Sequence, residues 1–285
     1  MAKYTPQPGL FDDDAEYRAF VEKFKPKKTT DDCYTPPAVY DALLKWFREN
    51  LPLFPPGANV LRPFWPGADF RALTYGENDV VVDNPPFSIL AKIVDFYLAH
   101  RIPFLLFAPH LTLFGLVGPR KGVTALVAGA NLIYANGAKV STSFVTNMDD
   151  PETMFRTVPD LKLLVEEASK SSLEPAREVV PKAWPPELVS ASLLGKVVVP
   201  GVEWIVQRRH CRFVRKLQNS KHGVFGGGFL LSRSATAERT AVERVAAERA
   251  AAERAAIERG AAERAAAERV ELSESEKKTV RELGR

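Results

Sequence analysis

The chain has 285 residues, of which 46% are hydrophobic, and a formal net charge of +4. This length suits one sizeable core with an appendage, and no apolar run reaches the roughly 18 to 20 residues of a membrane span. The amino terminus lacks the order of charged, apolar and small residues that marks a secretory signal. Cys33 and Cys211 have neither metal-ligand spacing nor the density of a disulfide framework. We expect a globular cytoplasmic protein with no membrane partner and no metal.

Changes in composition divide the chain into four parts. Residues 1–30 are an arm rich in Pro, Lys and Asp, with one short helix expected over 15–24. Residues 31–148 alternate apolar runs with turn signals and are the predicted core domain. Residues 149–233 are a Pro-interrupted connector followed by a basic accessory region, and residues 234–285 are a repeat-rich tail.

The core domain has the pattern of an α/β sheet. Apolar residues that share one helical face predict helices over 38–49 and 89–97. Short apolar runs predict buried strands at 59–61, 80–82 and 104–107. Asn136-Gly137 separates the apolar runs 131–134 and 139–146, and this spacing predicts an antiparallel hairpin that closes a parallel sheet.

The strand expected at 80–82 ends in an unusual polar corner, Asp83-Asn84-Pro85-Pro86-Phe87. Ligands of α/β sheets bind at the carboxyl ends of parallel strands. The two prolines remove two backbone donors, so neighbouring carbonyls are free to accept hydrogen bonds. With the Asn84 oxygen and the Phe87 ring, the corner suits a planar base with an exocyclic amine. The structural alternative is a strand end stiffened by proline, with Ser88 as a helix cap.

Three further candidates follow along the chain. His110 is expected at a strand end on the ligand face, where it is either a pocket residue or an ordinary core histidine. His210, Cys211 and His222 do not have the spacing of a four-ligand metal site. The glycines within 225–229 lack the strand-to-helix context of a phosphate loop, so a flexible turn is expected there.

A basic field lies between Trp204 and Arg233, where seven Lys and Arg residues occur without one acid. Such a field is typical of a surface that binds the phosphates of a nucleic acid, and a solvated basic surface is the alternative. Together with the aromatic Trp204 and Phe213, these residues are the predicted nucleic-acid contacts: Arg208, Arg209, Arg212, Arg215 and Lys216.

The tail repeats a Glu-Arg pair every five residues, from Glu238-Arg239 to Glu268-Arg269, with Ala as the main spacer. Five residues turn a helix by about 500°, so successive pairs spiral around the axis and leave no apolar stripe. Alanine favours the helix strongly. The repeat therefore predicts a long, exposed single helix rather than a coiled coil, serving as a spacer or as a handle for self-association.

Asn84-Pro85-Pro86-Phe87 also matches, position by position, the Asn/Asp-Pro-Pro-Tyr/Phe motif of the DNA adenine methyltransferases, which use S-adenosylmethionine. Tyr34-Thr35-Pro36-Pro37 resembles a Thr-Pro-Pro segment that opens a helix beside the donor pocket in one group of these enzymes. Capping alone would also explain it, with Thr35 as N-cap and Pro36 as the first helical residue. Residues 61–67 resemble the donor motif of an acid, Pro, Phe and glycines, with Arg62 replacing the acid.

The resemblance covers about 31–148 and implies a reduced Rossmann-like methyltransferase sheet, because only about sixteen residues separate Gly67 from Asn84. It implies a compact, phage-type enzyme that methylates a flipped adenine in DNA. The implied catalytic residues are Asn84, Pro85, Pro86 and Phe87, and the implied donor pocket consists of Tyr34, Thr35, Pro36, Phe64 and Gly67. The alternative is a catalytically inactive relative that binds nucleic acid or a protein partner. In a third interpretation, the Glu-Arg helix is the active part of a structural protein.

Overall fold

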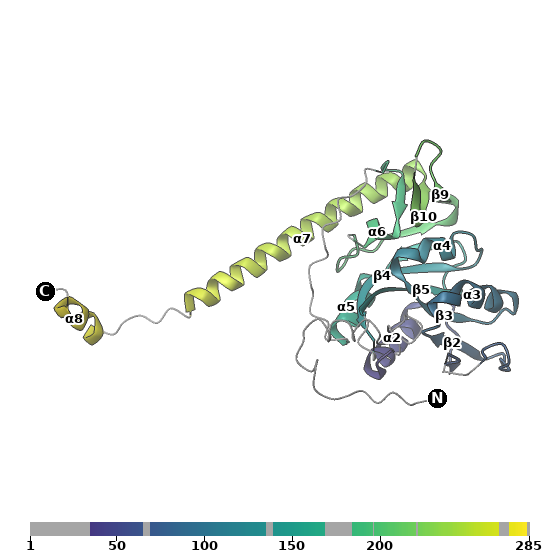
Figure 1. Ribbon diagram of the computed structural model, residues 1–285, viewed down its shortest axis with the longest axis horizontal. Coiled ribbons are helices and arrows are strands. Elements are labelled where there is room, and N and C mark those ends of the chain that lie inside the picture. Colours follow the sequence, from purple (N-terminus) through teal and green to yellow (C-terminus); the bar gives the residue numbers. More distant parts are fainter. Residues whose placement is uncertain are drawn as a thin grey trace, which may run out of the picture.

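The computed structural model describes residues 35–64, 69–134, 139–168, 184–195, 197–220, 222–267 and 274–283. The short helix expected over 15–24 and the Asn136-Gly137 turn lie outside these residues. A seven-stranded sheet forms the body, with strand order β1-β2-β3-β5-β4-β6-β8 (Figure 1). Its strands are β1 (Asn59–Leu61), β2 (Asp79–Asp83), β3 (Phe104–Pro109), β4 (Thr124–Ile133), β5 (Lys139–Thr146), β6 (Thr153–Thr157) and β8 (Ile205–Gln207).

Most strands of this sheet run in one direction. The pairs β1·β2, β2·β3 and β4·β6 are parallel, whereas β5 runs antiparallel to both β3 and β4, and β8 runs antiparallel to β6. The expected strands at 59–61, 80–82 and 104–107 are confirmed, and β4 and β5 pair antiparallel as expected. The expectation that this pair closes the sheet is wrong, because β6 pairs with the other edge of β4. The chain is a mixed α/β protein, and its mostly parallel central sheet is compatible with a Rossmann-like fold.

Both faces of the sheet are covered. In β3, Phe104 and Leu106 pack into one core cluster, whereas Leu105 and Phe107 pack into the other. Successive strand residues point to opposite faces, so a fully apolar strand requires cover on both sides. Helices α2 (Pro37–Asn50) and α5 (Pro159–Ala168) cover one face, and α3 (Leu90–Ala99) and α4 (Leu113–Val117) cover the other.

The sheet continues beyond residue 148, where the sequence suggested that the core domain ends. β6 and β8 extend it on the side of β4, and their residues Phe155 and Val206 belong to the same core cluster as α3 and α4. The predicted connector thus supplies β6 to the main sheet. The proline-rich composition of this segment gave no indication of a strand.

A second, three-stranded sheet has the order β7-β10-β9 and is wholly antiparallel. It consists of β7 (Leu188–Ser190), β9 (Cys211–Lys216) and β10 (Gly223–Leu231), with α6 (Ala191–Leu194) after β7. Phe229 of β10 joins the main core through Phe114 of α4, with ring centroids 4.7 Å apart. The glycines at 226–228 lie inside β10, so the expectation of a flexible turn is wrong.

The Glu-Arg repeat forms α7 (Arg233–Ala267), and α8 (Glu274–Leu283) follows. The beginning of α7 packs on the body: Ala235 and Ala246 are buried, and Arg239 donates to the carbonyls of Pro186 and Leu188. The remainder of α7 extends away from the body (Figure 1). The predicted helix is confirmed, but its first half is docked rather than exposed. Among the described helices, we find none that combines the length and the apolar character needed to cross a bilayer.

Candidate functional site

The polar corner lies at the carboxyl end of β2, as the sequence predicts. Pro85 is buried, whereas Asn84, Pro86 and Phe87 are half-buried. The chain then turns through a short 3-10 helix, Phe87–Ile89, into α3. The N-cap of α3 is Ile89 and makes no side-chain capping bond, so the alternative with Ser88 as helix cap is wrong.

Asp83 is the anchor of this corner. Its carboxylate is 4% exposed and accepts hydrogen bonds from the backbone N–H of Asn84 at 2.9 Å and of Phe64 at 3.0 Å. Arg62 Nε donates to the same carboxylate at 3.4 Å. Burial raises the pKa of Asp83 even though these three donors act to lower it. Asp83 therefore ties the loop after β1 to the first residue of the Asn-Pro-Pro-Phe motif.

Arg62, which stands where the resembling family has an acid, also contacts α2. Its guanidinium carbon lies 3.9 Å from the centroid of the Tyr40 ring, a cation–π distance. Tyr40 Oη donates to the Val82 carbonyl at 2.8 Å, and burial raises the pKa of this phenol. Residues from α2, from the loop after β1 and from the end of β2 thus meet at one place, although Tyr40 and Val82 are 42 positions apart in sequence.

The start of α2 lies one helical turn from Tyr40, since the Tyr40 N–H donates to the Pro36 carbonyl at 3.0 Å. Pro36 is the N-cap and Pro37 is the first helical residue, without a side-chain capping bond. The prediction of Thr35 as N-cap and Pro36 as first helical residue is therefore wrong. Thr35 is 6% exposed, and its hydroxyl has no hydrogen-bond partner in the described part of the chain.

The other predicted donor residues are placed less completely. Phe64 is half-buried, and its ring centroid lies 5.7 Å from that of Phe70. Its backbone N–H is the group that bonds Asp83. Tyr34 and Gly67 lie outside the described residues. Of the predicted donor residues, Phe64 contacts Asp83 beside Asn84, whereas Pro36 is placed only through its hydrogen bond to Tyr40.

His110 is buried in the core, and its Nε2 has no hydrogen-bond partner in the described part of the chain. Its Nδ1 lies 3.0 Å from Ser143 Oγ, which also accepts the backbone N–H groups of Ala128 and Gly129. Because these two N–H groups donate to the hydroxyl oxygen, the hydroxyl can donate its own proton to Nδ1. Burial lowers the pKa of His110 to about 4, so the ring is neutral at pH 7.

The five predicted nucleic-acid contacts divide into two groups. Arg208 is half-buried and donates to three backbone carbonyls, those of Arg120, Val123 and Pro151, so it is used to join loops of the body. The other four side chains are exposed: Arg209, Arg212, Arg215 and Lys216. None of these four forms an ion pair with a residue that the structure describes.

The aromatic residues expected beside them face inward. Trp204 is 3% exposed and packs edge-on against Phe155, and Phe213 is half-buried against Phe229. Phe225 is instead the exposed ring of this region, at 75%.

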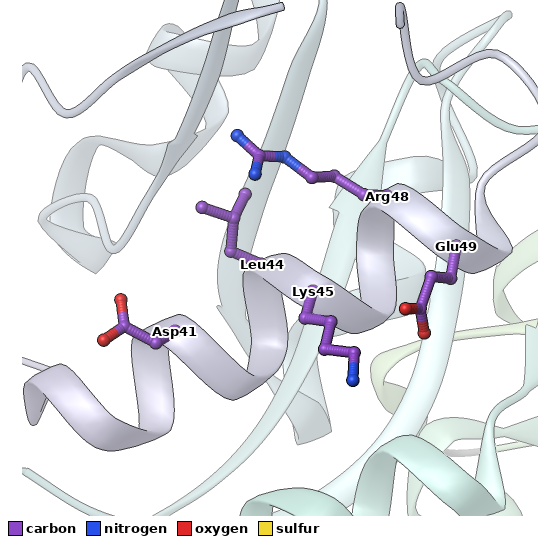
Figure 2. Close-up of a pocket in the computed structure, with 5 residues that line it drawn as sticks. All are labelled: Asp41, Leu44, Lys45, Arg48 and Glu49. Atoms are coloured by element: carbon purple, nitrogen blue, oxygen red, sulfur yellow. The ribbon is translucent and has the colours of Figure 1, made fainter. Parts of the chain in front are cut away.

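A shallow depression lies on the outward face of α2 (Figure 2). The described residues that line it come from this helix alone: Asp41, Leu44, Lys45, Arg48 and Glu49. Figure 2 shows their charged groups spread apart along the helix rather than converging on one point. The depression includes none of the predicted site residues, so it adds nothing to the candidate site.

The sequence placed Asp83 in the corner but gave it no role, and it did not single out Tyr40. A carboxylate that follows three buried valines was a usable signal for Asp83, because a buried charge requires partners. Tyr40 gave no signal beyond its apolar helical position.

We find no cluster of metal-ligating side chains among the described residues. Comparisons with protein-family models, curated proteins and solved structures found no match.

Proposed function

We propose that the chain is a DNA adenine methyltransferase that transfers a methyl group from S-adenosylmethionine to the exocyclic amine of a flipped adenine. The observation that carries the proposal is the convergence of three segments. Thr35-Pro36, the loop from Arg62 to Phe64, and Asn84 to Phe87 resemble family motifs separately. Contacts through Tyr40 and Asp83 join them at the carboxyl end of β2.

The acceptor half of the proposed reaction uses the corner after β2. Asn84 Oδ1 and the Pro85 carbonyl accept hydrogen bonds from the two N–H groups of the amine, and Phe87 stacks on the base. Pro85 and Pro86 offer no N–H that would compete for these acceptors. Asp83 holds the backbone of Asn84 from behind. These residues act by positioning and polarising the amine, without a covalent nucleophile.

The donor half is assigned to the space between the start of α2 and the loop after β1. The buried Thr35 hydroxyl lacks a partner in the described chain, which fits a site that takes a polar group of a ligand. Thr35, Pro36 and Phe64 would hold S-adenosylmethionine there, together with Tyr34 and Gly67 from the neighbouring segments. The bound donor supplies the methyl group.

The proposed fold is a reduced methyltransferase sheet. β1 and β2 are adjacent and parallel, and the described part of the 17-residue connection between them contains neither helix nor strand. The antiparallel pair of β5 and β4 follows β3 in the sheet, and β6 and β8 continue it. The compact core fits an enzyme of phage type.

The Arg62–Asp83 contact favours a second candidate, a catalytically inactive relative that binds nucleic acid or a protein partner. A cation stands where the family has an acid, and the nearest carboxylate is already engaged by it. In this case the acceptor corner would remain as a binding surface without methyl transfer.

Calorimetric titration with S-adenosylmethionine separates the two candidates. The proposal predicts that the wild-type protein and Asn84→Ala bind the donor equally, because Asn84 belongs to the acceptor half. Thr35→Val keeps the shape and removes the hydroxyl, and loss of one hydrogen bond should weaken binding by roughly 3- to 12-fold. Absence of binding to the folded wild-type protein at millimolar donor would exclude the enzyme and leave the second candidate.

A further inference from the structure

The hairpin of β9 and β10 presents an aromatic ring to solvent in a basic surrounding. Phe225 is 75% exposed, more than any other exposed large hydrophobic residue in the described chain. A side chain of this size is ordinarily buried, because covering it removes a large apolar area from water. Its exposure therefore requires either a partner or a constraint that prevents burial.

The constraint is a bulge in β10. Lys216 of β9 pairs with Gly223 of β10, and the next recorded pair joins Val214 of β9 to Gly228 of β10. Four residues of β10, from Val224 to Gly227, thus stand opposite Arg215 alone. Gly226 and Gly227 have φ values of +70° and +80°, which side-chain-bearing residues rarely adopt.

The bulge is packed tightly against the body. A Cβ on Gly226 would lie 1.8 Å from the Leu111 carbonyl oxygen, and a Cβ on Gly115 would lie 2.9 Å from the Gly226 oxygen. A Cβ on Gly227 would lie 2.5 Å from the Phe213 ring. The backbone beneath Phe225 is therefore held in place, and the ring is presented by a rigid support.

The strand that pairs with the bulge carries three basic residues. Arg215 lies opposite the bulge, and Arg212 and Lys216 lie on the same strand, all exposed and without an ion pair to a described residue. A rigid aromatic face among cations fits a polymer that offers flat bases and phosphates. An acidic peptide would satisfy the cations but would leave the ring without a flat partner.

The bulge also lies near the carboxyl end of the main sheet. Its Gly226 contacts Leu111 in the 3-10 helix His110–Thr112, which directly follows β3. β2 and β3 are parallel neighbours, so Asp83 at the end of β2 pairs with Leu106 three residues before the end of β3. A DNA strand that crosses this edge passes from the Asn84 corner, over the end of β3, to the hairpin.

We infer that Phe225 stacks on a base of DNA, beside phosphates held by Arg212, Arg215 and Lys216. The inference rests on the proposed function in naming DNA as the polymer. It does not depend on methyl transfer, because the hairpin shares no residue with the Asn84 corner. The contact is non-covalent and tolerant of sequence, since every base has a face on which a ring can stack.

Fluorescence anisotropy with a labelled single-stranded DNA 20-mer, without the methyl donor, tests the inference. Phe225→Ala should weaken binding by about 5-fold or more, as expected for loss of one stacked base, while Phe225→Tyr should bind as the wild type does. Ile257→Ala removes another exposed apolar side chain, at 62%, and is the matched control that should bind normally. The assay contains no methyl donor, so failure of this contact is distinguished from failure of methyl transfer.

Salt dependence separates stacking from charge. Arg212→Ala and Arg215→Ala should each lower the slope of log affinity against log salt by about 0.7, the value for one phosphate of a single strand. Phe225→Ala should leave that slope unchanged. Equal affinities of Phe225→Ala and the wild type, equal losses at Phe225 and Ile257, or tighter binding to RNA than to DNA of the same sequence would each overturn the inference.

Discussion

Substitution of Gly226 by alanine tests how firmly the bulge in β10 is held. The new Cβ would lie 1.8 Å from the Leu111 carbonyl oxygen, about half of an ordinary contact distance, and backbone rather than a side chain must move. The positive φ of Gly226 alone costs an alanine about 1 to 2 kcal/mol. Forcing an extra carbon into a packed site adds about 1 to 3 kcal/mol. The free energy of unfolding should therefore fall by about 2 to 5 kcal/mol.

Gly122→Ala is the matched control, because Gly122 has a φ of +69° and no atom within 4 Å of its Cβ position. It should lose only the backbone contribution of about 1 to 2 kcal/mol. Urea unfolding at equilibrium, extrapolated linearly to water, measures both values. The reasoning is refuted if the two variants lose the same free energy, since the bulge would then not be pressed against the 3-10 helix.

Two further predictions concern burial and docking. Burial lowers the pKa of His110 from 6.5 to about 4. Between these two pH values, the imidazole is protonated in the unfolded chain but neutral in the native chain. Stability should therefore fall by about 3 kcal/mol as pH drops from 7 to 4, and urea unfolding of His110→Gln should show a correspondingly weaker pH dependence. Arg249 donates to the Pro200 carbonyl and lies against Gly201, so Arg249→Ala should speed protease cleavage within the first half of α7. Arg254→Ala, beyond the docked part, should leave the cleavage rate unchanged, and equal rates for both variants would show that Arg249 does not anchor the helix.

Sequence pattern was sufficient where a short-range signal decides the structure. The apolar runs at 59–61, 80–82 and 104–107 became parallel strands, and the five-residue repeat became one continuous helix. Sequence pattern failed where contacts between distant segments determine the structure. β6 pairs with β4 across more than 20 positions, and the proline-rich composition between residues 149 and 200 gave no sign of a strand of the main sheet.

The glycines of β10 illustrate the same limit. A run of glycines predicts flexibility from local propensity, whereas in the fold it permits close contact with Leu111, Gly115 and Phe213. Arg208 shows the same limit for a charged residue. Its basic sequence neighbours suggest an exposed position, but its guanidinium donates to three backbone carbonyls. Tertiary contacts of this kind leave no periodic trace in the sequence.

For the candidate site, the sequence located Asn84 to Phe87 at the end of a buried strand, and the structure agrees. It did not reveal what holds this corner to the other motifs. The contacts of Asp83 with Phe64 and Arg62, and of Tyr40 with Val82, arise only when α2, β1 and β2 pack together. A substitution that looked like the loss of an acid, Arg62, proves to be part of an ion pair with Asp83.

Methyl transfer to DNA tests the central proposal most directly. The wild-type protein and Asn84→Ala are incubated with methyl-labelled S-adenosylmethionine and DNA, and the nucleosides are separated after digestion. The account predicts label on the exocyclic amine of adenine for the wild type. It predicts none for Asn84→Ala, although this variant still folds and binds the donor. Full label in the Asn84→Ala reaction, or no label with a wild-type protein that binds donor and DNA, would contradict it.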